Sequence, residues 1–299
     1  MISSRFSYIW TELGYFVMSL LISRERILID EVHGLKRLRA LIDESTLEHP
    51  IREELLLCFL RARKFNVERA FKSLKNYLKM VKNYPELLAN LSVSKLRPQL
   101  KEQLQIVYKS KDKLGRRIFI FRAGRWNPNK LSLDDIFRCN VFCLQQLASN
   151  FDAQINGIVA IVDLQNLSLN QARHFTPSYA KKIADLLTEA FPLSFQTIHI
   201  VNQNWIVDML MSIIWPFLSA KIQKRVKTGF ESYIHSRVLN FNIRFFKGFV
   251  HGSCWASLHE YVDAADLPED YGGFREQLDC FKLFEAVTNE ETCNLFNLN

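Results

Sequence analysis

The sequence predicts an α/β fold, with a mainly parallel sheet flanked by helices and preceded by an all-helical N-terminal subdomain. Three observations support this prediction. Apolar residues recur at helical spacing through residues 25–100. Short β-branched runs then alternate with helical segments, an order typical of parallel sheets. One run, from Gly157 to Asp163, is apolar almost throughout, which indicates a strand covered on both faces.

The composition is that of a globular protein with an anionic partner. The 299 residues, 48% of them hydrophobic, suffice for one large domain or two modest ones and argue against global disorder. The net charge of +8 fits phosphate-bearing lipid or nucleic acid. We do not expect nucleic acid, because zinc-finger spacing, an RNP-like aromatic motif and a dense basic arm are all missing from the sequence.

The cysteines indicate neither a metal site nor a disulfide framework. Six are scattered along the chain: Cys58, Cys139, Cys143, Cys254, Cys280 and Cys293. Cys139 and Cys143 lie one helical turn apart but have no second ligand pair nearby, so we expect no metal. Buried free thiols in a reducing compartment are the preferred interpretation.

Residues 1–24 are an apolar segment of uncertain role. The run from Phe6 to Ile22 is shorter than the about 20 apolar residues of a spanning helix, and it carries Glu12. Charged residues follow it, where a signal peptide would have small residues at a cleavage site. We expect an amphipathic or tucked helix; an interfacial anchor and a signal or span are the alternatives.

Residues 25–100 are predicted to be helical. The first helix carries an apolar stripe of Ile27, Leu28, Val32, Leu35, Leu38, Leu41 and Ile42. Two further helices are expected over 55–65 and 67–84, because Asn66 between them suits a helix cap. Pro85 is expected to end the second of these.

The spacing of apolar residues changes after residue 100. Strands are expected over 105–109 and 118–122, joined by a turn that contains Gly115. Ser132 and Asp135 form a capping pattern for a helix that runs to about residue 150. The strand from Gly157 to Asp163 follows this helix.

The stretch from Phe175 to Val201 contains a helix, a sharp corner and a strand. Thr176 and Pro177 suit the start of the helix, and Pro192 forces Phe191 out of helical conformation. A β-branched strand is expected over 197–201. Residues 205–218 then form a helix that is apolar nearly all round, which indicates burial or contact with lipid. A last strand is expected over 249–251.

Several collinear segments resemble the CRAL-TRIO lipid-binding family, in its alpha-tocopherol transfer protein and retinaldehyde-binding branch. They are Leu56 to Leu78, Gly157 to Leu164, Phe175 to Val201, Pro216 to Leu218 with Lys221, and Leu267 to Gly273. The resemblance covers roughly residues 24–274. It implies a helical N-terminal subdomain over 25–100, a lipid-binding domain over 101–275 whose sheet and helices enclose a lipid cavity, and a C-terminal tail over 276–299.

The resemblance also implies site residues. Cavity-lining roles carry over to Phe137, Asn140, Leu144, Ile158, Val162, Leu186, Leu187, Phe191, Ile198, Ile214 and Leu218. The helix over 205–218 corresponds to the mobile gate over the ligand mouth. Phosphoinositide-binding roles carry over to Lys221, Arg225, Arg61 and Arg63. Ser194 and Gln196 replace two basic residues of the family pattern, and Asn140 and Leu144 replace small hydroxyl residues.

The expected function is therefore binding of one hydrophobic molecule, of the tocopherol, retinoid or phospholipid class, and its transfer between membranes. We expect a cytoplasmic monomer that docks peripherally on anionic, phosphoinositide-bearing bilayers. The alternative is a phosphoinositide-sensing adaptor at a membrane that does not transfer lipid. We expect no enzyme and no cofactor, because the phosphate-loop, dinucleotide, nucleophile-elbow and zinc-protease motifs are missing from the sequence.

The family pattern is interrupted over residues 227–248. This segment is basic and aromatic, with Phe230, Tyr233 and Phe241 among its residues. It is long for a loop inside an α/β unit. The preferred interpretation is an in-frame retained intron, and the alternative is an added element that contacts a membrane.

Overall fold

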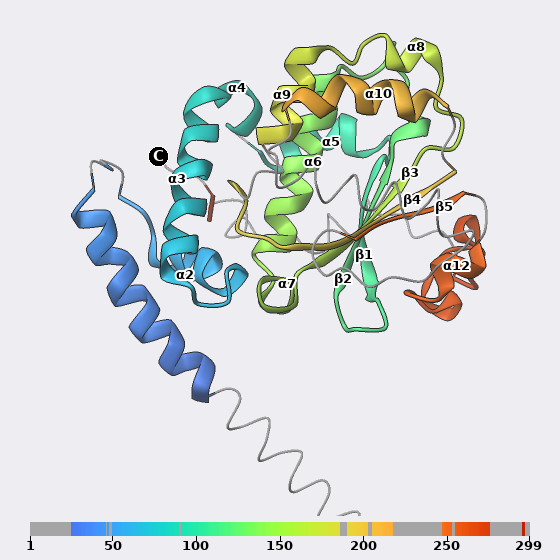
Figure 1. Cartoon of the computed structure of the whole chain (residues 1–299). Coiled ribbons are helices and arrows are strands. Elements are labelled where there is room, and N and C mark those ends of the chain that lie inside the picture. Colours follow the sequence, from blue (N-terminus) through green and yellow to red (C-terminus); the bar gives the residue numbers. More distant parts are fainter. Residues whose placement is uncertain are drawn as a thin grey trace, which may run out of the picture.

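A five-stranded sheet in the order β1-β2-β3-β4-β5 forms the centre of the protein (Figure 1). The strands are β1 (Gln105–Lys111), β2 (Arg117–Arg122), β3 (Ile158–Asp163), β4 (Phe195–Val201) and β5 (Lys247–Gly252). Strands β2 to β5 pair in parallel, and β1 joins β2 as an antiparallel hairpin. The prediction of a mainly parallel α/β sheet is thus confirmed.

The structure, a computed structural model, describes residues 25–45, 47, 50–89, 91–185, 190–202, 205–217, 247–252, 255–275 and 295–296. The sequence expectations for residues 1–24, for the tail over 276–294 and for most of the segment 227–248 fall outside these residues. The same holds for Leu186, Leu187, Leu218, Lys221 and Arg225. No helix within the described ranges is long and apolar enough to cross a membrane.

Helices precede the sheet and connect its strands. The N-terminal part contains a helix over 25–43, α2 (Glu53–Ala62), α3 (Val67–Asn83), α4 (Pro85–Leu88) and α5 (Val93–Leu100). The remainder contains α6 (Leu133–Ala148), α7 (Phe151–Asn156), α8 (Leu169–Ala172), α9 (Pro177–Asp185), α10 (Ile206–Ile214) and α12 (Trp255–His259). Short 3-10 turns lie at Ala123–Arg125, Trp215–Phe217, Ala264–Asp266 and Glu269–Tyr271.

Local capping explains where three of the predicted helices begin. The Asn66 side chain accepts a hydrogen bond of 2.8 Å from the backbone N–H of Arg69, which starts α3. Ser132 and Asp135 form the predicted capping box of α6, with reciprocal bonds of 3.1 and 2.9 Å. Thr176 accepts a longer bond of 3.4 Å from Tyr179 at the start of α9. Side-chain caps satisfy backbone donors that a helix end otherwise leaves free.

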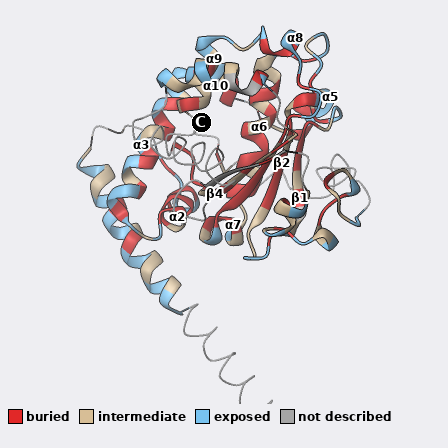
Figure 2. Ribbon diagram, turned by 45° about the vertical axis from the view of Figure 1, so that its right-hand side comes forward, coloured by how far each residue is buried: buried red, intermediate tan, exposed pale blue. Residues whose placement is uncertain are grey.

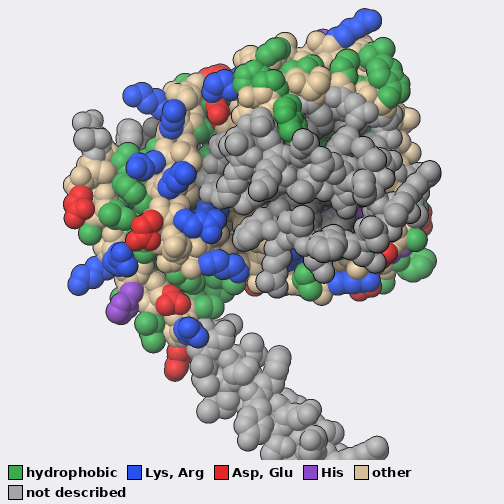
Figure 3. All heavy atoms as spheres, in the orientation of Figure 1, with side chains coloured by type: hydrophobic (Ala, Val, Ile, Leu, Met, Phe, Trp, Pro, Cys, Tyr) green, Lys and Arg blue, Asp and Glu red, His purple; other side chains and the backbone are tan. Residues whose placement is uncertain are grey.

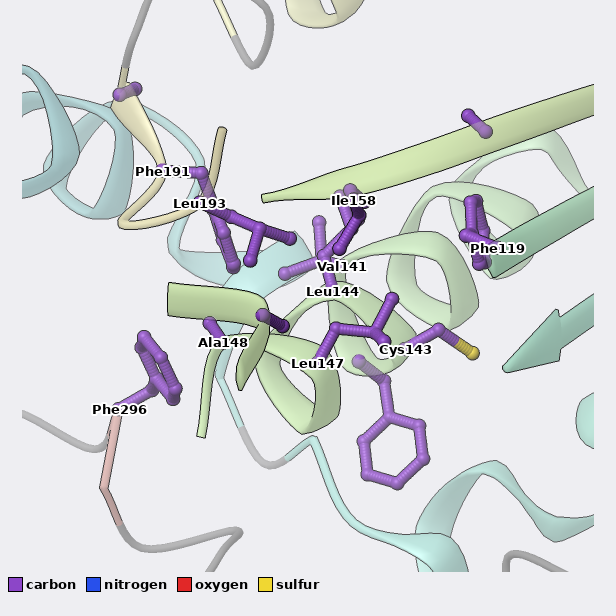
Figure 4. Close-up of a cluster of buried hydrophobic side chains, with 14 of the residues drawn as sticks. Phe119, Val141, Cys143, Leu144, Leu147, Ala148, Ile158, Phe191, Leu193 and Phe296 are labelled. Carbon is purple, nitrogen blue, oxygen red and sulfur yellow. The ribbon is translucent and has the colours of Figure 1, made fainter. Parts of the chain in front are cut away.

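One large apolar core joins the helical subdomain to the sheet. Figure 2 shows that β2, β3 and the inner faces of α2, α3 and α6 are largely buried. Within this core, Val141 and Leu144 of α6 meet Ile158 at the beginning of β3, and Phe191 and Leu193 come from the corner before β4 (Figure 4). Phe191 also stacks on Phe296, whose ring centroid is 5.8 Å away, so the far C-terminal residues contact this core.

The helix over 25–43 contributes apolar side chains to the core only along its second half. Leu38 is fully buried and Leu35, Leu41 and Ile42 pack against the core. Leu28 and Val32, predicted to belong to the same stripe, are 59% and 68% exposed. The helix extends away from the domain at its N-terminal end (Figure 1), so no described segment lies opposite these residues.

Three of the cysteines lie in described parts of the chain. Cys58, Cys139 and Cys143 are buried free thiols, as predicted. Burial raises the pKa of Cys58 and of Cys139 to about 12, because an apolar surrounding disfavours the thiolate. Within the described ranges no cluster of His, Cys, Asp and Glu has the arrangement of a metal site.

Candidate functional site

An apolar cavity of about 270 Å³ lies between the sheet and the helices α6, α9 and α10. The described residues that line it are Phe121, Ala123, Trp126, Leu133, Ile136, Phe137, Asn140, Val162, Leu164, Leu167, Gln171, Ala172, Phe175, Tyr179, Ile183, Ile200, Leu210 and Ile214. None of these residues carries a formal charge. The cavity is near the lower end of the usual size of ligand pockets, about 300–1,000 Å³.

The floor of the cavity is one row of side chains across the sheet. Val162 of β3 is the register partner of Phe121 on β2 and of Ile200 on β4. Because side chains alternate between the two faces of a strand, these three point to the same side. The row lies near the carboxyl ends of parallel strands, where open α/β sheets usually bind ligands.

One face of α6 forms a wall of the cavity. Leu133, Ile136, Phe137 and Asn140 follow spacings of three and four residues, which place them on one side of a helix. The capping box at Ser132 fixes where the helix begins, and so fixes which residues face the cavity. Further along the helix, Leu144 packs into the apolar core.

Helices α9 and α10 form the opposite wall. Ile183 of α9 and Leu210 and Ile214 of α10 reach the cavity. The two helices pack through Ala184 of α9, which contacts Ile214 and Trp215. At the two ends of this segment, Trp205 is 64% exposed and Phe217 is 38% exposed. The outer wall of the cavity therefore carries large apolar groups in contact with solvent.

Four lining side chains bear polar atoms, and three of them are engaged by the protein. Trp126 donates to the carbonyl of Leu131 at 2.8 Å. Gln171 donates to two carbonyls and accepts from Ser168. The Tyr179 hydroxyl donates to Asp134, and burial together with this carboxylate raises the Tyr179 pKa. Asn140 differs, because its buried Oδ1 has no hydrogen-bond partner among the described residues.

The predicted cavity residues fall into three groups. Phe137, Asn140, Val162 and Ile214 line the cavity. Leu144, Ile158, Phe191 and Ile198 belong to or pack against the apolar core near the amino ends of the strands. Leu186, Leu187 and Leu218 lie outside the described residues.

The sequence reasoning missed most of the lining. The missed residues include Phe121 and Ile200, which flank Val162 in its row across the sheet. Strand alternation predicts which residues share a face, but the row also requires the register between strands. The segment after β3, with Leu164, Leu167 and Gln171, carried no periodic signal that pointed to a cavity.

The predicted basic residues have different surroundings. Arg63 is only 5% exposed and donates to the Phe191 carbonyl and the Ser73 hydroxyl, both at 2.9 Å. The expectation that Arg63 binds a headgroup is therefore corrected, because its guanidinium lies inside the protein. Arg61 is partly exposed and forms an ion pair of 2.7 Å with Glu31.

The other face of the sheet carries a polar cluster. His199 of β4 and His251 of β5 share a hydrogen bond of 2.8 Å, and His251 also contacts the Ser257 hydroxyl at 2.6 Å. Nearby on the same face, Asp163 accepts from Tyr271 at 3.2 Å. These contacts hold residues 255–275 against the sheet and leave the cavity face apolar.

The chain matches two domain families in sequence. The CRAL/TRIO domain matches residues 101–273, which include the whole sheet and every described cavity residue. The CRAL/TRIO N-terminal domain matches residues 34–76, over the end of the first helix, α2 and much of α3.

Individual proteins resemble the chain over most of its length. It is 32% identical over 250 residues to an alpha-tocopherol transfer protein-like protein of Homo sapiens. This alignment covers 82% of this chain and 67% of that protein. It is 31% identical over 223 residues to clavesin-1 of Xenopus laevis, covering 74% of this chain and 60% of clavesin-1. The crystal structure of Sfh5 shares the fold, with a TM-score of 0.53 and 14% identity over 85% of this chain and 90% of that one.

Proposed function

This chain belongs to the CRAL/TRIO family of lipid-binding proteins, and from that premise we propose that it takes one neutral hydrophobic molecule into the cavity and carries it between membranes. The observation that carries the proposal is the cavity itself, whose described lining is apolar and uncharged. Burial of apolar surface contributes roughly 25 cal/mol per Å², so a water-insoluble molecule gains most of its binding free energy there without a charged partner.

The cargo passes through the wall formed by α9 and α10. Helix α10 is apolar on most sides, and Trp205 and Phe217 at its ends are exposed. Exposed aromatic residues beside an apolar helix suit the interface of a bilayer, where part of the ring contacts acyl chains and the rest contacts water and headgroups. Movement of α10 at a membrane would open the cavity towards the acyl chains, while the sheet stays in place.

Docking on an anionic bilayer is the finer part of the proposal. The family resemblance implies that Lys221 and Arg225 bind a lipid headgroup, and both lie outside the described residues. Arg61 contributes to the same headgroup site in this proposal. A basic group near an anionic surface contributes about 1 kcal/mol. Replacing Lys221 and Arg225 by Glu should weaken binding to vesicles that contain phosphoinositide, and should spare uptake of cargo from solution.

A phosphoinositide-sensing adaptor without transfer activity is the second candidate. The exposed side chains of Trp205 and Phe217 serve membrane attachment equally well if the cavity never releases its contents. The two candidates differ in whether cargo moves between donor and acceptor vesicles.

The test is transfer between vesicles by the wild type and two matched variants. Ile183→Trp fills the cavity from α9. Leu169→Trp adds the same ring on neighbouring α8, at an exposed residue that does not line the cavity. We expect Ile183→Trp to lose most transfer and bound lipid, while Leu169→Trp retains both. Equal transfer by both variants would contradict a role for this cavity, and bound lipid without transfer by the wild type would favour the adaptor.

A further inference from the structure

We propose that Asn140 selects a cargo with a hydroxyl group at its polar end. This inference rests on the proposed function and specifies the ligand class of the same cavity. The other polar side chains of the described lining, those of Trp126, Gln171 and Tyr179, are already committed to hydrogen bonds within the protein. Asn140 is the described lining residue that retains a buried acceptor with no partner.

The chemistry of an amide defines the complementary group. A primary amide presents an acceptor oxygen beside a donor nitrogen, so a hydroxyl can donate to the first and accept from the second. An aldehyde, an ether or a carboxylate only accepts, and would leave Oδ1 buried without a partner. A carboxylate or phosphate would also lie among residues that carry no positive charge. The cargo is therefore a neutral, largely apolar alcohol or phenol.

The position of Asn140 fits this role. It lies on the cavity side of α6, one helical turn after Phe137. The helix is held in place by the capping box at its start and by burial of its other face, including Cys139 and Phe142. A polar group on a packed helix keeps a fixed position, so it can discriminate between ligands that differ by one hydrogen-bond donor.

The test compares two ligands with their methyl ethers: cetyl alcohol and α-tocopherol. Methylation removes the donor and keeps the apolar body. We expect the wild type to bind each alcohol about tenfold or more tightly than its ether, which corresponds to one lost hydrogen bond and an unsatisfied acceptor. Asn140→Leu should lose this preference and still bind both ethers. Phe137→Leu, a control in the same wall, should weaken alcohol and ether alike.

The outcomes separate this inference from the carrier function. Equal binding of alcohol and ether by the wild type, or a preference that survives in Asn140→Leu, would overturn the role of Asn140 and leave the carrier function standing. Uptake of none of the four molecules by the wild type would overturn the carrier function, and this inference with it.

A second, independent observation concerns a basic stripe on α3. The stripe consists of Arg69, Lys72, Lys75, Lys79 and Lys82, which are all exposed and follow spacings of three and four residues along one side of the helix. In Figure 3 a column of Lys and Arg side chains lies over this helix. No described acidic residue forms an ion pair with any of the four lysines.

We infer that this stripe is a docking surface for an anionic bilayer. Arg69 and Lys82 are thirteen helical steps apart, each of about 1.5 Å, so the stripe is a straight array roughly 20 Å long. A straight array of lysines suits a flat surface of negative headgroups. The stripe also ends beside the cavity wall, because Tyr84, next after α3, donates to Asp185 of α9 at 2.7 Å. Docking through α3 would bring α9 and α10 to the membrane.

The test measures binding to vesicles of phosphatidylcholine with and without phosphatidylserine. Neutralising Lys72 and Lys79 to Gln should reduce affinity for the anionic vesicles roughly 30-fold, from about 1 kcal/mol for each charge near the surface. Lys95→Gln on α5 with Lys101→Gln, directly after α5, makes the same change in net charge and should have little effect. Equal losses in the two double variants would overturn the inference. Binding of single-stranded RNA that depends on Lys72 and Lys79, with vesicle binding unchanged, would reassign the stripe to nucleic acid.

Discussion

The guanidinium of Arg63 donates a hydrogen bond of 2.9 Å to the backbone carbonyl of Phe191, across 128 residues of sequence. The same guanidinium reaches Ser73 on α3. Arg63 thus joins the helical subdomain to the corner that precedes β4, and it does so from inside the protein. A surface lysine or arginine would be replaceable at little cost, but Ser73 and Phe191 are buried, so water does not readily replace the hydrogen bonds from Arg63.

We predict that Arg63→Met lowers the free energy of unfolding by roughly 2–4 kcal/mol. The change leaves buried acceptors without a donor, each at a cost of about 1–3 kcal/mol. Urea unfolding followed by circular dichroism measures this. Arg52→Met, at an exposed residue next to α2, is the control and should stay within about 0.5 kcal/mol. Similar effects of the two variants would show that the buried contacts of Arg63 do not stabilise the fold.

A second prediction concerns pH. Burial lowers the pKa of His199 to about 3, with a smaller contribution from neighbouring His251, and burial lowers the pKa of His251 to about 4. Both values lie below the 6.5 of an unfolded histidine. The unfolded chain therefore binds more protons as pH falls below 6.5, and the fold loses stability down to about pH 4.

The loss should approach about 1.4 kcal/mol per pH unit for each histidine, and reach a few kcal/mol in total. Urea unfolding at pH 7.5, 6.0 and 5.0 measures this loss of stability. These pH values lie above the range in which most carboxylates titrate. The double variant His199→Gln, His251→Gln should flatten the pH dependence, whereas His33→Gln, at an exposed residue, should not. An unchanged slope in the double variant would count against the buried pair as its source.

The third prediction concerns thiol reactivity. Burial raises the pKa of Cys58 and Cys139 to about 12, so at pH 8 neither presents much thiolate. In a background with Cys254, Cys280 and Cys293 changed to Ser, we expect negligible reaction with a disulfide reagent in the folded protein. In urea all three remaining thiols should react. A thiol that reacts rapidly in the folded state would show that the core around α2 or α6 opens readily.

A fourth prediction compares two glycines that share a positive φ. Gly115 and Gly157 have φ of 75° and 74°, and Gly157 also has ψ of −171°, a combination that is essentially restricted to glycine. A Cβ at Gly115 would meet no atom within 4 Å, but at Gly157 it would lie 2.5 Å from the carbonyl oxygen of Ser194. Gly157→Ala should therefore destabilise the protein by at least about 2 kcal/mol more than Gly115→Ala. Equal destabilisation would mean that the strand after Gly157 can shift freely.

Much of the fold could be predicted because it depends on local chemistry. Three helix starts are fixed by contacts within three residues. They involve Asn66, the pair Ser132 and Asp135, and Thr176. The sheet was predictable because β-branched runs alternate with helices.

The remainder depends on contacts between distant residues. Val32 and Leu38 look alike in the apolar stripe of the first helix, and only the packing of the subdomain exposes one and buries the other. The sequence alone suggests that Arg63 is a surface residue, and only its contact with Phe191, which is distant in sequence, shows that it is buried. The cavity row of Phe121, Val162 and Ile200 required strand register, which no local pattern in the sequence specifies.

The two halves of each central strand have separate tasks. On β3, Ile158 and Val162 point to the same side, but the first belongs to the core and the second to the cavity floor. On β4, Ile198 and Ile200 divide in the same way. Substitutions at the carboxyl ends can therefore reshape the space offered to a ligand, while the amino ends keep the sheet anchored. A scaffold of this kind can acquire a new cargo by a few changes in one row without first losing its ability to fold.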